Sequence, residues 1–136
     1  MTREDKELLL KDLSARLPYN PVVEYKEETY NVLGIAHGRL VLCKPFMSNT
    51  LSECPLVEEV KPYLFPMSSM TEEQKREYYF LKHEVPVCHY EYGDVVEDFE
   101  LYDSPESFEY LIENHFDYRG LIPMGLALDA TNLNIY

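Results

Sequence analysis

The positions of the prolines divide this sequence into segments that each suit one helix or a few short strands. Pro18 stops a first helical pattern, Pro86 ends a second, and Pro105 opens a third. The stretches between them include runs of β-branched and aromatic residues, which favour strands. This order predicts an α+β fold with an N-terminal helix, an antiparallel sheet of about four strands and two further helices covering one face.

The first and third helices have the clearest start signals. Thr2 precedes an acidic first turn, and Ser104 precedes Pro105, which loses no needed hydrogen bond at a first helical position. The apolar stripe of the first helix is Leu9, Leu10, Leu13 and Leu17. The apolar stripe of the third helix is Phe108, Leu111, Ile112 and His115. Each helix therefore has one face suited to packing on a sheet.

The second helix begins at one of two capping boxes, Ser69 with Glu72 or Thr71 with Gln74. Its apolar positions at helical spacing are Tyr78, Leu81 and Val85. The segment 85–103 then alternates only in part between apolar and polar residues and contains Gly93-Asp94. It predicts either one hairpin or one strand followed by a loop.

The segment 22–44 predicts two or three antiparallel strands, with turns at Glu27-Glu28 and His37-Gly38. Residues 45–55 have the proline and polar content of a surface loop. The next segment, LVEEVKPYLFP, is short, apolar and bounded by prolines. It is interpreted as an edge strand or an irregular crossover.

The chain length predicts a single domain, residues 1–136, because 136 residues with 46% hydrophobic content suffice for one core and not for two ordinary domains. No stretch approaches the roughly 18 apolar residues of a membrane helix. The start, MTREDKELLLKDL, has charges where a signal peptide would be apolar. We expect a cytoplasmic protein without a membrane partner.

Negative charge is concentrated in one part of the sequence. Residues 83–118 contain eleven Asp and Glu and no Lys or Arg, so they contribute −11 of the formal −13. The rest of the chain sums to −2. This distribution excludes the basic surface expected of a protein that binds nucleic acid directly.

The acidic segment supplies the candidate partner-binding residues. On a strand Asp98 and Glu100 would share a face, about 7 Å apart. On a helix Glu106, Glu109 and Glu113 would share another. Tyr102 and Tyr110 are interleaved with them and could act as aromatic anchors. The competing interpretation is a negative surface that serves solubility alone and has no partner.

His83, Cys88 and His89 are the weak candidates for a metal site, because zinc prefers nitrogen and sulfur ligands. Structural zinc sites usually show paired ligands at short fixed spacings, and this cluster has none. We therefore expect a solvated loop here, with no metal and no other cofactor.

The stretch HFDYRGLIPMGLALDA, residues 115–130, places a histidine, an aspartate and an arginine close together. We interpret it as a turn, with Asp117 capping a short helical turn and Gly125 in a left-handed conformation. Arg119 would pair with Asp117 or a helix-end carbonyl. The core residues expected here are Phe116, Leu121, Ile122 and Met124. A catalytic cluster would also need a pocket and a nucleophile, which the sequence does not indicate, so we expect no catalytic residues.

Three sequence blocks resemble a group of small uncharacterised proteins encoded in phage-related or mobile regions of gut Bacteroidales genomes. The blocks are ELLLKDLSARLPY, VKPYLFPMSSMTEEQKREYY and HFDYRGLIPMGLALDA, about a third of the chain. The resemblance implies a recurring fold and a phage or prophage origin. It implies no activity, because the group has none assigned.

Three functional hypotheses remain from the sequence. The first is a non-enzymatic interaction protein, an accessory factor of a phage or mobile element, with a protein partner for which a basic protein is one candidate. The second is an acidic decoy that imitates nucleic acid toward a DNA-binding host protein. The third and weakest is a small metal-dependent enzyme using His83, Cys88 and His89.

Overall fold

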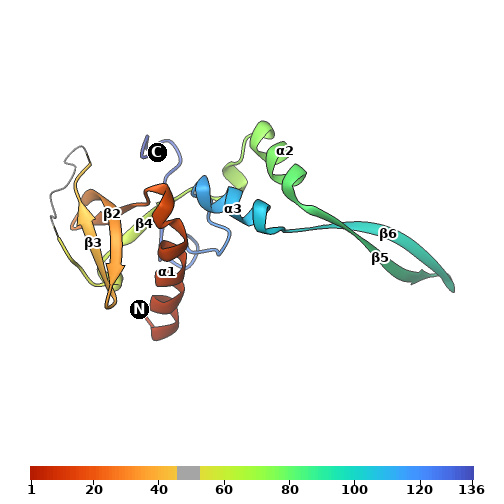
Figure 1. Ribbon diagram of the computed structural model, residues 1–136, viewed down its shortest axis with the longest axis horizontal. Coiled ribbons are helices and arrows are strands. Elements are labelled where there is room, and N and C mark those ends of the chain that lie inside the picture. The colour runs from red at the N-terminus through yellow and green to blue at the C-terminus, as the bar shows by residue number, and fades with distance from the viewer. Residues whose placement is uncertain (46–52) are drawn as a thin grey trace. The chain divides into compact units, whose positions relative to one another are not determined.

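The computed structural model describes residues 1–45 and 53–136, with the side chains of Val87, His89 and Tyr90 left out. Its α-helices are α1 (Arg3–Arg16), α2 (Glu72–Leu81) and α3 (Pro105–Glu113). Its strands are β1 (Val22–Tyr25), β2 (Glu28–Ala36), β3 (Arg39–Cys43), β4 (Lys61–Leu64), β5 (His83–Glu91), β6 (Asp94–Tyr102) and β7 (Leu128–Asp129). The fold is therefore α+β with three α-helices in the described residues, as predicted (Figure 1).

The chain separates into two compact units. Unit 1 comprises Met1–Ser69 and Ile112–Tyr136, and unit 2 comprises Met70–Leu111. Most of the predicted loop lies at residues 46–52, outside the described residues.

Helix α1 begins as its sequence predicts. The Thr2 hydroxyl accepts a hydrogen bond from the Asp5 amide at 3.1 Å, and the Asp5 carboxylate accepts one from the Thr2 amide at 3.2 Å. This reciprocal cap satisfies amide groups that the first turn leaves without helical partners. Leu9 and Leu13 are fully buried. The predicted leucine stripe thus faces the core.

The sheet of unit 1 is mixed, so the prediction of a wholly antiparallel sheet is wrong. Its strand order is β3-β2-β1-β4-β7. Strands β1, β2 and β3 pair antiparallel, and β1 pairs antiparallel with β4. Strand β7 pairs in parallel with β4, because a long connection brings the chain back in the same direction. The direction of this pairing depends on residues far apart in the chain, so local alternation does not predict it.

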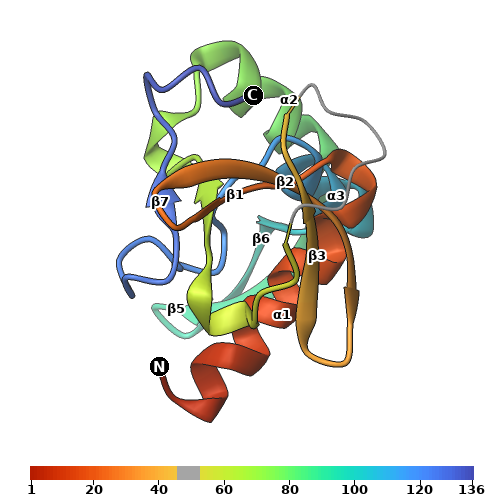
Figure 2. The same ribbon diagram turned by 90° about the vertical axis from the view of Figure 1, so that its left-hand side faces the viewer.

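Strand β4 lies inside this sheet, between β1 and β7, and not at an edge as its prolines suggested (Figure 2). Leu9 and Leu13 of α1 join Val23, Leu40 and Leu42 of the sheet in one buried cluster. The C-terminal residues Leu121, Leu126 and Ala127 complete it. The core of unit 1 is therefore closed by residues from both ends of the chain.

Unit 2 contains α2, β5, β6 and most of α3. Of the two predicted capping boxes, Thr71 with Gln74 begins α2: the Thr71 hydroxyl accepts from the Gln74 amide at 3.2 Å. The helix ends at Leu81, and Val85, predicted to lie on its apolar face, belongs to β5. A residue before proline is disfavoured in a helix, which explains why Val85 is extended.

Candidate protein-interaction hairpin

Strands β5 and β6 form a two-stranded sheet in unit 2, which is the hairpin that segment 85–103 allowed. Nine residue pairs run without a register shift from His83↔Tyr102 to Glu91↔Asp94. The connecting residues Tyr92 and Gly93 have φ values of 52° and 85°. Two positive φ values define a type I′ turn, whose twist matches that of the strands. Gly93 accepts this conformation without the strain of a side chain.

The hairpin exposes side chains that sheets usually bury. Every described side chain of β5 and β6 is exposed except Val96, which is half-buried. Val95 and Phe99 are 60% and 61% exposed, and Leu101 is 49% exposed. These apolar side chains are therefore exposed surface of a ribbon of only two strands.

The register divides the hairpin into two faces, since paired residues share a face and neighbours along a strand alternate. The first, here called the apolar face, carries Pro86, Cys88, Val95, Phe99 and Leu101, with Glu84 and Glu97. The second, here called the carboxylate face, carries the side chains of Glu91, Asp94, Asp98 and Glu100, together with Tyr102, Val85 and Val96. The Tyr102 hydroxyl donates to the Glu100 carboxylate at 2.6 Å, and this raises the pKa of Tyr102. Charge and apolar surface are thus partly separated.

A polar cluster holds the base of the hairpin. Asp103, directly after β6, accepts hydrogen bonds from the Tyr78 hydroxyl of α2 and, at 3.0 Å, from the Ser107 hydroxyl of α3. The Ser104 hydroxyl donates to the Leu81 carbonyl at 2.5 Å. Burial, followed by the bond to Asp103, raises the pKa of Tyr78 well above its usual value. The hairpin therefore starts from an anchored base within unit 2.

The candidate partner-binding residues divide between two elements. Asp98 and Glu100 share the carboxylate face of the hairpin, as their spacing predicts, and Tyr102 lies on the same face. The other predicted carboxylates, Glu106, Glu109 and Glu113, are exposed on α3. Tyr110 is half-buried and stacks on Tyr78 with ring centroids 6.4 Å apart, so it contributes to packing in unit 2.

Two of the three candidate metal ligands, His83 and Cys88, lie apart in the structure. They are on opposite faces of β5, and the five residue steps between them span roughly 16 Å of extended strand. The side chain of His89 lies outside the described residues. Among the side chains that the structure describes, no group of three His, Cys, Asp or Glu could hold a metal ion. The predicted solvated loop at this place is wrong, because the segment is a strand.

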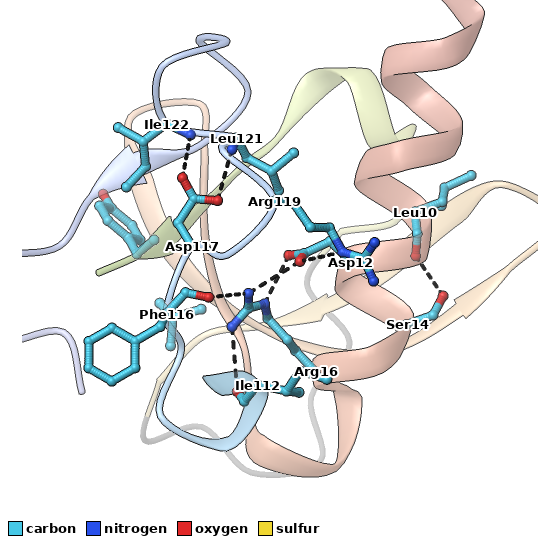
Figure 3. A network of polar contacts seen from close by, with 12 residues as sticks. Leu10, Asp12, Ser14, Arg16, Ile112, Phe116, Asp117, Arg119, Leu121 and Ile122 are labelled. Atoms are coloured by element: carbon cyan, nitrogen blue, oxygen red, sulfur yellow. Dashed lines mark hydrogen bonds and ion pairs between the residues drawn. The ribbon is translucent and has the colours of Figure 1, made fainter. Parts of the chain in front are cut away.

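The cluster at residues 115–119 belongs to a buried network in unit 1 (Figure 3). Arg16, fully buried in α1, donates to Asp12 at 2.9 Å and 3.2 Å. The same guanidinium donates to the carbonyl of Phe116 at 2.6 Å and of Ile112 at 3.4 Å. Arg119 pairs with Asp12 at 3.3 Å, whereas the partners expected from the sequence were Asp117 or a helix-end carbonyl. These contacts tie α1 to the C-terminal segment.

Asp117 accepts hydrogen bonds from the amides of Leu121 and Ile122, both at 2.8 Å. It thereby caps the predicted turn, and Gly125 has the predicted positive φ, 76°. Phe116 and Leu121 are buried as expected, whereas Met124 is 49% exposed. The polar residues of this segment are thus engaged in structural contacts.

His115 is also buried, with its ring stacked on Tyr136 at a centroid distance of 3.7 Å. Burial and the nearby Arg16 lower the pKa of His115 from 6.5 to about 4. A neutral, enclosed imidazole with no nucleophile among its described contacts has the features of a packing residue.

The buried pair of Asp12 and Arg16 was not predicted from the sequence. A signal was present, because Leu9, Asp12, Leu13 and Arg16 follow one another at helical spacing on the leucine stripe. Opposite charges four residues apart on an apolar face indicate a buried ion pair.

No family model, curated protein or solved structure matches this chain. In the part of the chain that the structure describes, none of the helices has the length and apolar character needed to span a bilayer.

Proposed function

We propose that this protein is a non-enzymatic interaction protein whose β5–β6 hairpin binds a basic protein partner. The observation that carries the proposal is the exposure of apolar side chains on a ribbon that has carboxylates and no Lys or Arg. A surface that served solubility alone would not need exposed Phe99 and Leu101. The resemblance of three sequence blocks supports a role as an accessory factor of a phage or mobile element.

The test is capture of proteins from a bacterial host lysate by the purified chain and by two charge-matched variants. The hairpin variant combines Asp98→Asn with Glu100→Gln. The control combines Glu73→Gln with Glu77→Gln, two exposed carboxylates of α2. We expect one discrete basic protein to be captured by the parent and the control, and to be lost from the hairpin variant and at high salt. Equal capture by both variants contradicts the proposal.

A second candidate is a decoy that imitates nucleic acid. It is favoured by the placement of Asp98 and Glu100 on one face of the hairpin and by the exposed Glu106, Glu109 and Glu113 on α3. A decoy occupies the DNA-binding surface of its target, so duplex DNA should compete for the captured protein. Replacing the three α3 glutamates with Gln should also weaken capture. An interaction through the hairpin that ignores DNA rejects the decoy and keeps the first proposal.

A further inference from the structure

We propose that the hairpin binds its partner by strand addition: the outer edge of β6 pairs with an extended basic segment of the partner. This inference rests on the proposed function and specifies how the hairpin would bind. It depends on which backbone groups of the two strands face outward, which the turn geometry determines.

A type I′ turn of two residues closes on a hydrogen-bonded pair, here Glu91↔Asp94. Hydrogen-bonded and non-hydrogen-bonded pairs then alternate along an antiparallel ladder. Five pairs further, Pro86↔Phe99 is a non-hydrogen-bonded pair, so the amide of Phe99 faces away from β5. That amide donates instead to the Asp98 carboxylate at 2.8 Å, as expected for a group outside the ladder.

The two outer edges differ in what they offer to another strand. On β5, Pro86 stands at one of the outward positions and has no N–H to donate. On β6, the outward positions are Val95, Glu97, Phe99 and Leu101, and the strand has no Pro, no Gly and no register shift. Strand β6 therefore has an unbroken row of outward donors and acceptors, which is the template that strand addition needs.

The negative charge of the hairpin favours a basic strand at the outer edge of β6. The two strands contain six carboxylates and no Lys or Arg. Edge-to-edge pairing of two copies would place these charges beside each other, which disfavours a second copy of this chain. A partner strand with Lys or Arg at alternate positions would set them beside the carboxylate face, around Asp98 and Glu100. Its other side chains would lie beside the apolar face, around Phe99 and Leu101.

The Asp98 side chain adds selectivity to this edge. In the free protein its carboxylate accepts the hydrogen bond of the outward Phe99 amide. An incoming strand has to displace it, and a basic side chain of that strand offers the displaced carboxylate an ion pair. A neutral strand offers no such compensation, so the edge discriminates by charge.

The experiment uses the full chain and two peptides. The probe is capped Lys-Val-Lys-Val-Lys-Val-Lys, and its control has the same side chains with N-methyl groups on the three central residues. N-methylation blocks both edges of the peptide strand without changing its charge. We expect the control to bind at least about tenfold more weakly. Hydrogen exchange with the probe bound should show protection at alternate residues of β6, namely Val95, Glu97, Phe99 and Leu101, and not at Glu84 or Cys88 of β5.

Matched variants test the same point from the protein side. Glu97 and Cys88 face each other, and both have outward amides. Glu97→Pro removes an outward donor from β6, and Cys88→Pro removes one from β5. We expect Glu97→Pro to weaken probe binding about tenfold and Cys88→Pro less than about twofold. Glu97→Gln separates the loss of charge from the loss of the donor, and hydrogen exchange of the ladder amides reports whether each hairpin remains folded.

The outcomes distinguish this inference from the function on which it rests. Equal, salt-sensitive binding of both peptides overturns strand addition and leaves the hairpin as a charged docking surface. If neither peptide binds, strand addition by a basic segment is overturned, and the lysate capture decides the proposed function separately. Self-association through β6, seen as a dimer by sedimentation, overturns the choice of a basic partner.

Discussion

The two sheets of this protein are made from similar residues and have opposite surroundings. In unit 1, Val23, Leu40 and Leu42 are fully buried under α1 and the C-terminal residues. In unit 2, Val95, Phe99 and Leu101 of β6 are about half exposed or more. Apolar content is therefore a poor guide to burial here, because burial depends on whether a second layer covers the strand.

Acidic residues show the same contrast. In unit 1, buried Asp12 accepts hydrogen bonds from Arg16 and forms an ion pair with Arg119, and buried Asp117 accepts hydrogen bonds from two backbone amides. On the hairpin, Asp98 and Glu100 are exposed to solvent. Asp12 and Asp117 thus hold elements of unit 1 together, and under the proposed function Asp98 and Glu100 serve recognition.

Removal of Arg16 should have the largest effect on stability. Arg16→Ala leaves Asp12 buried with Arg119 as its remaining ion-pair partner among the described residues, and it takes a donor from the Phe116 carbonyl. We expect the free energy of unfolding in urea to fall by about 3–5 kcal/mol. The control is Arg3→Ala, whose side chain is 92% exposed and should matter by less than about 0.5 kcal/mol. Similar losses in the two variants would show that burial of the ion pair has no special role.

His115 should make the stability of the protein depend on pH. Its folded-state pKa, about 4, lies below the ordinary value of 6.5, so the unfolded chain takes up the proton first as pH falls. The contribution of neutral His115 is therefore complete above about pH 6.5 and is lost between pH 6.5 and 4, approaching about 3 kcal/mol.

The control for this effect is His115→Asn, because asparagine tolerates the φ of 60° at this position. Urea unfolding at pH 7, 5.5 and 4 should show a shallower decline for this variant than for the parent. Identical declines would mean that other groups cause the acid sensitivity.

Gly125→Val should cost about 1–3 kcal/mol, because a β-branched residue is strained at a φ of 76°. A Cβ there has open space around it, so backbone conformation alone accounts for the cost. Gly34→Val is the matched control, since Gly34 also has open space and lies in β2 without a positive φ. Thermal unfolding should separate the two variants, and equal melting temperatures would refute the turn assignment.

Phe99→Ala should have the smallest effect on folding. The side chain is 61% exposed on the apolar face, so its removal should change the free energy of unfolding by less than about 0.5 kcal/mol. The same change should weaken partner capture, because an exposed aromatic side chain is a typical interface anchor. A large loss of stability with unchanged capture would assign Phe99 to the fold.

Local signals predicted much of this fold from sequence. The cap at Thr2, the turn at His37-Gly38, the Thr71 box and the start of α3 at Pro105 all depend on residues close together in the chain. The predictions that failed depend on distant residues. The parallel pairing of β7, the inner position of β4 and the partner of Arg119 are decided by contacts across the chain, which periodicity does not report.

The hairpin, too, was predicted only in part from the sequence. The sequence allowed a hairpin and placed Asp98 and Glu100 on one face, as the register confirms. The sequence did not indicate that the apolar residues of the hairpin would stay exposed. Alternation predicts that a strand has two different faces, but it does not predict what covers each face. The exposure, and with it the outer edge of β6, could only be recognised in the structure.

Shortening the hairpin tests the division between fold and recognition most directly. Val85↔Glu100 is, like Glu91↔Asp94, a hydrogen-bonded pair, so Asn-Gly can replace residues 86–99 and close the ribbon with the same type of turn. Capture of the basic partner and urea unfolding would be measured on this variant. We predict that capture falls at least about tenfold while the free energy of unfolding changes by less than about 1 kcal/mol. Capture equal to that of the full chain, or loss of the folded state, would contradict the assignment of recognition to the hairpin and of stability to unit 1.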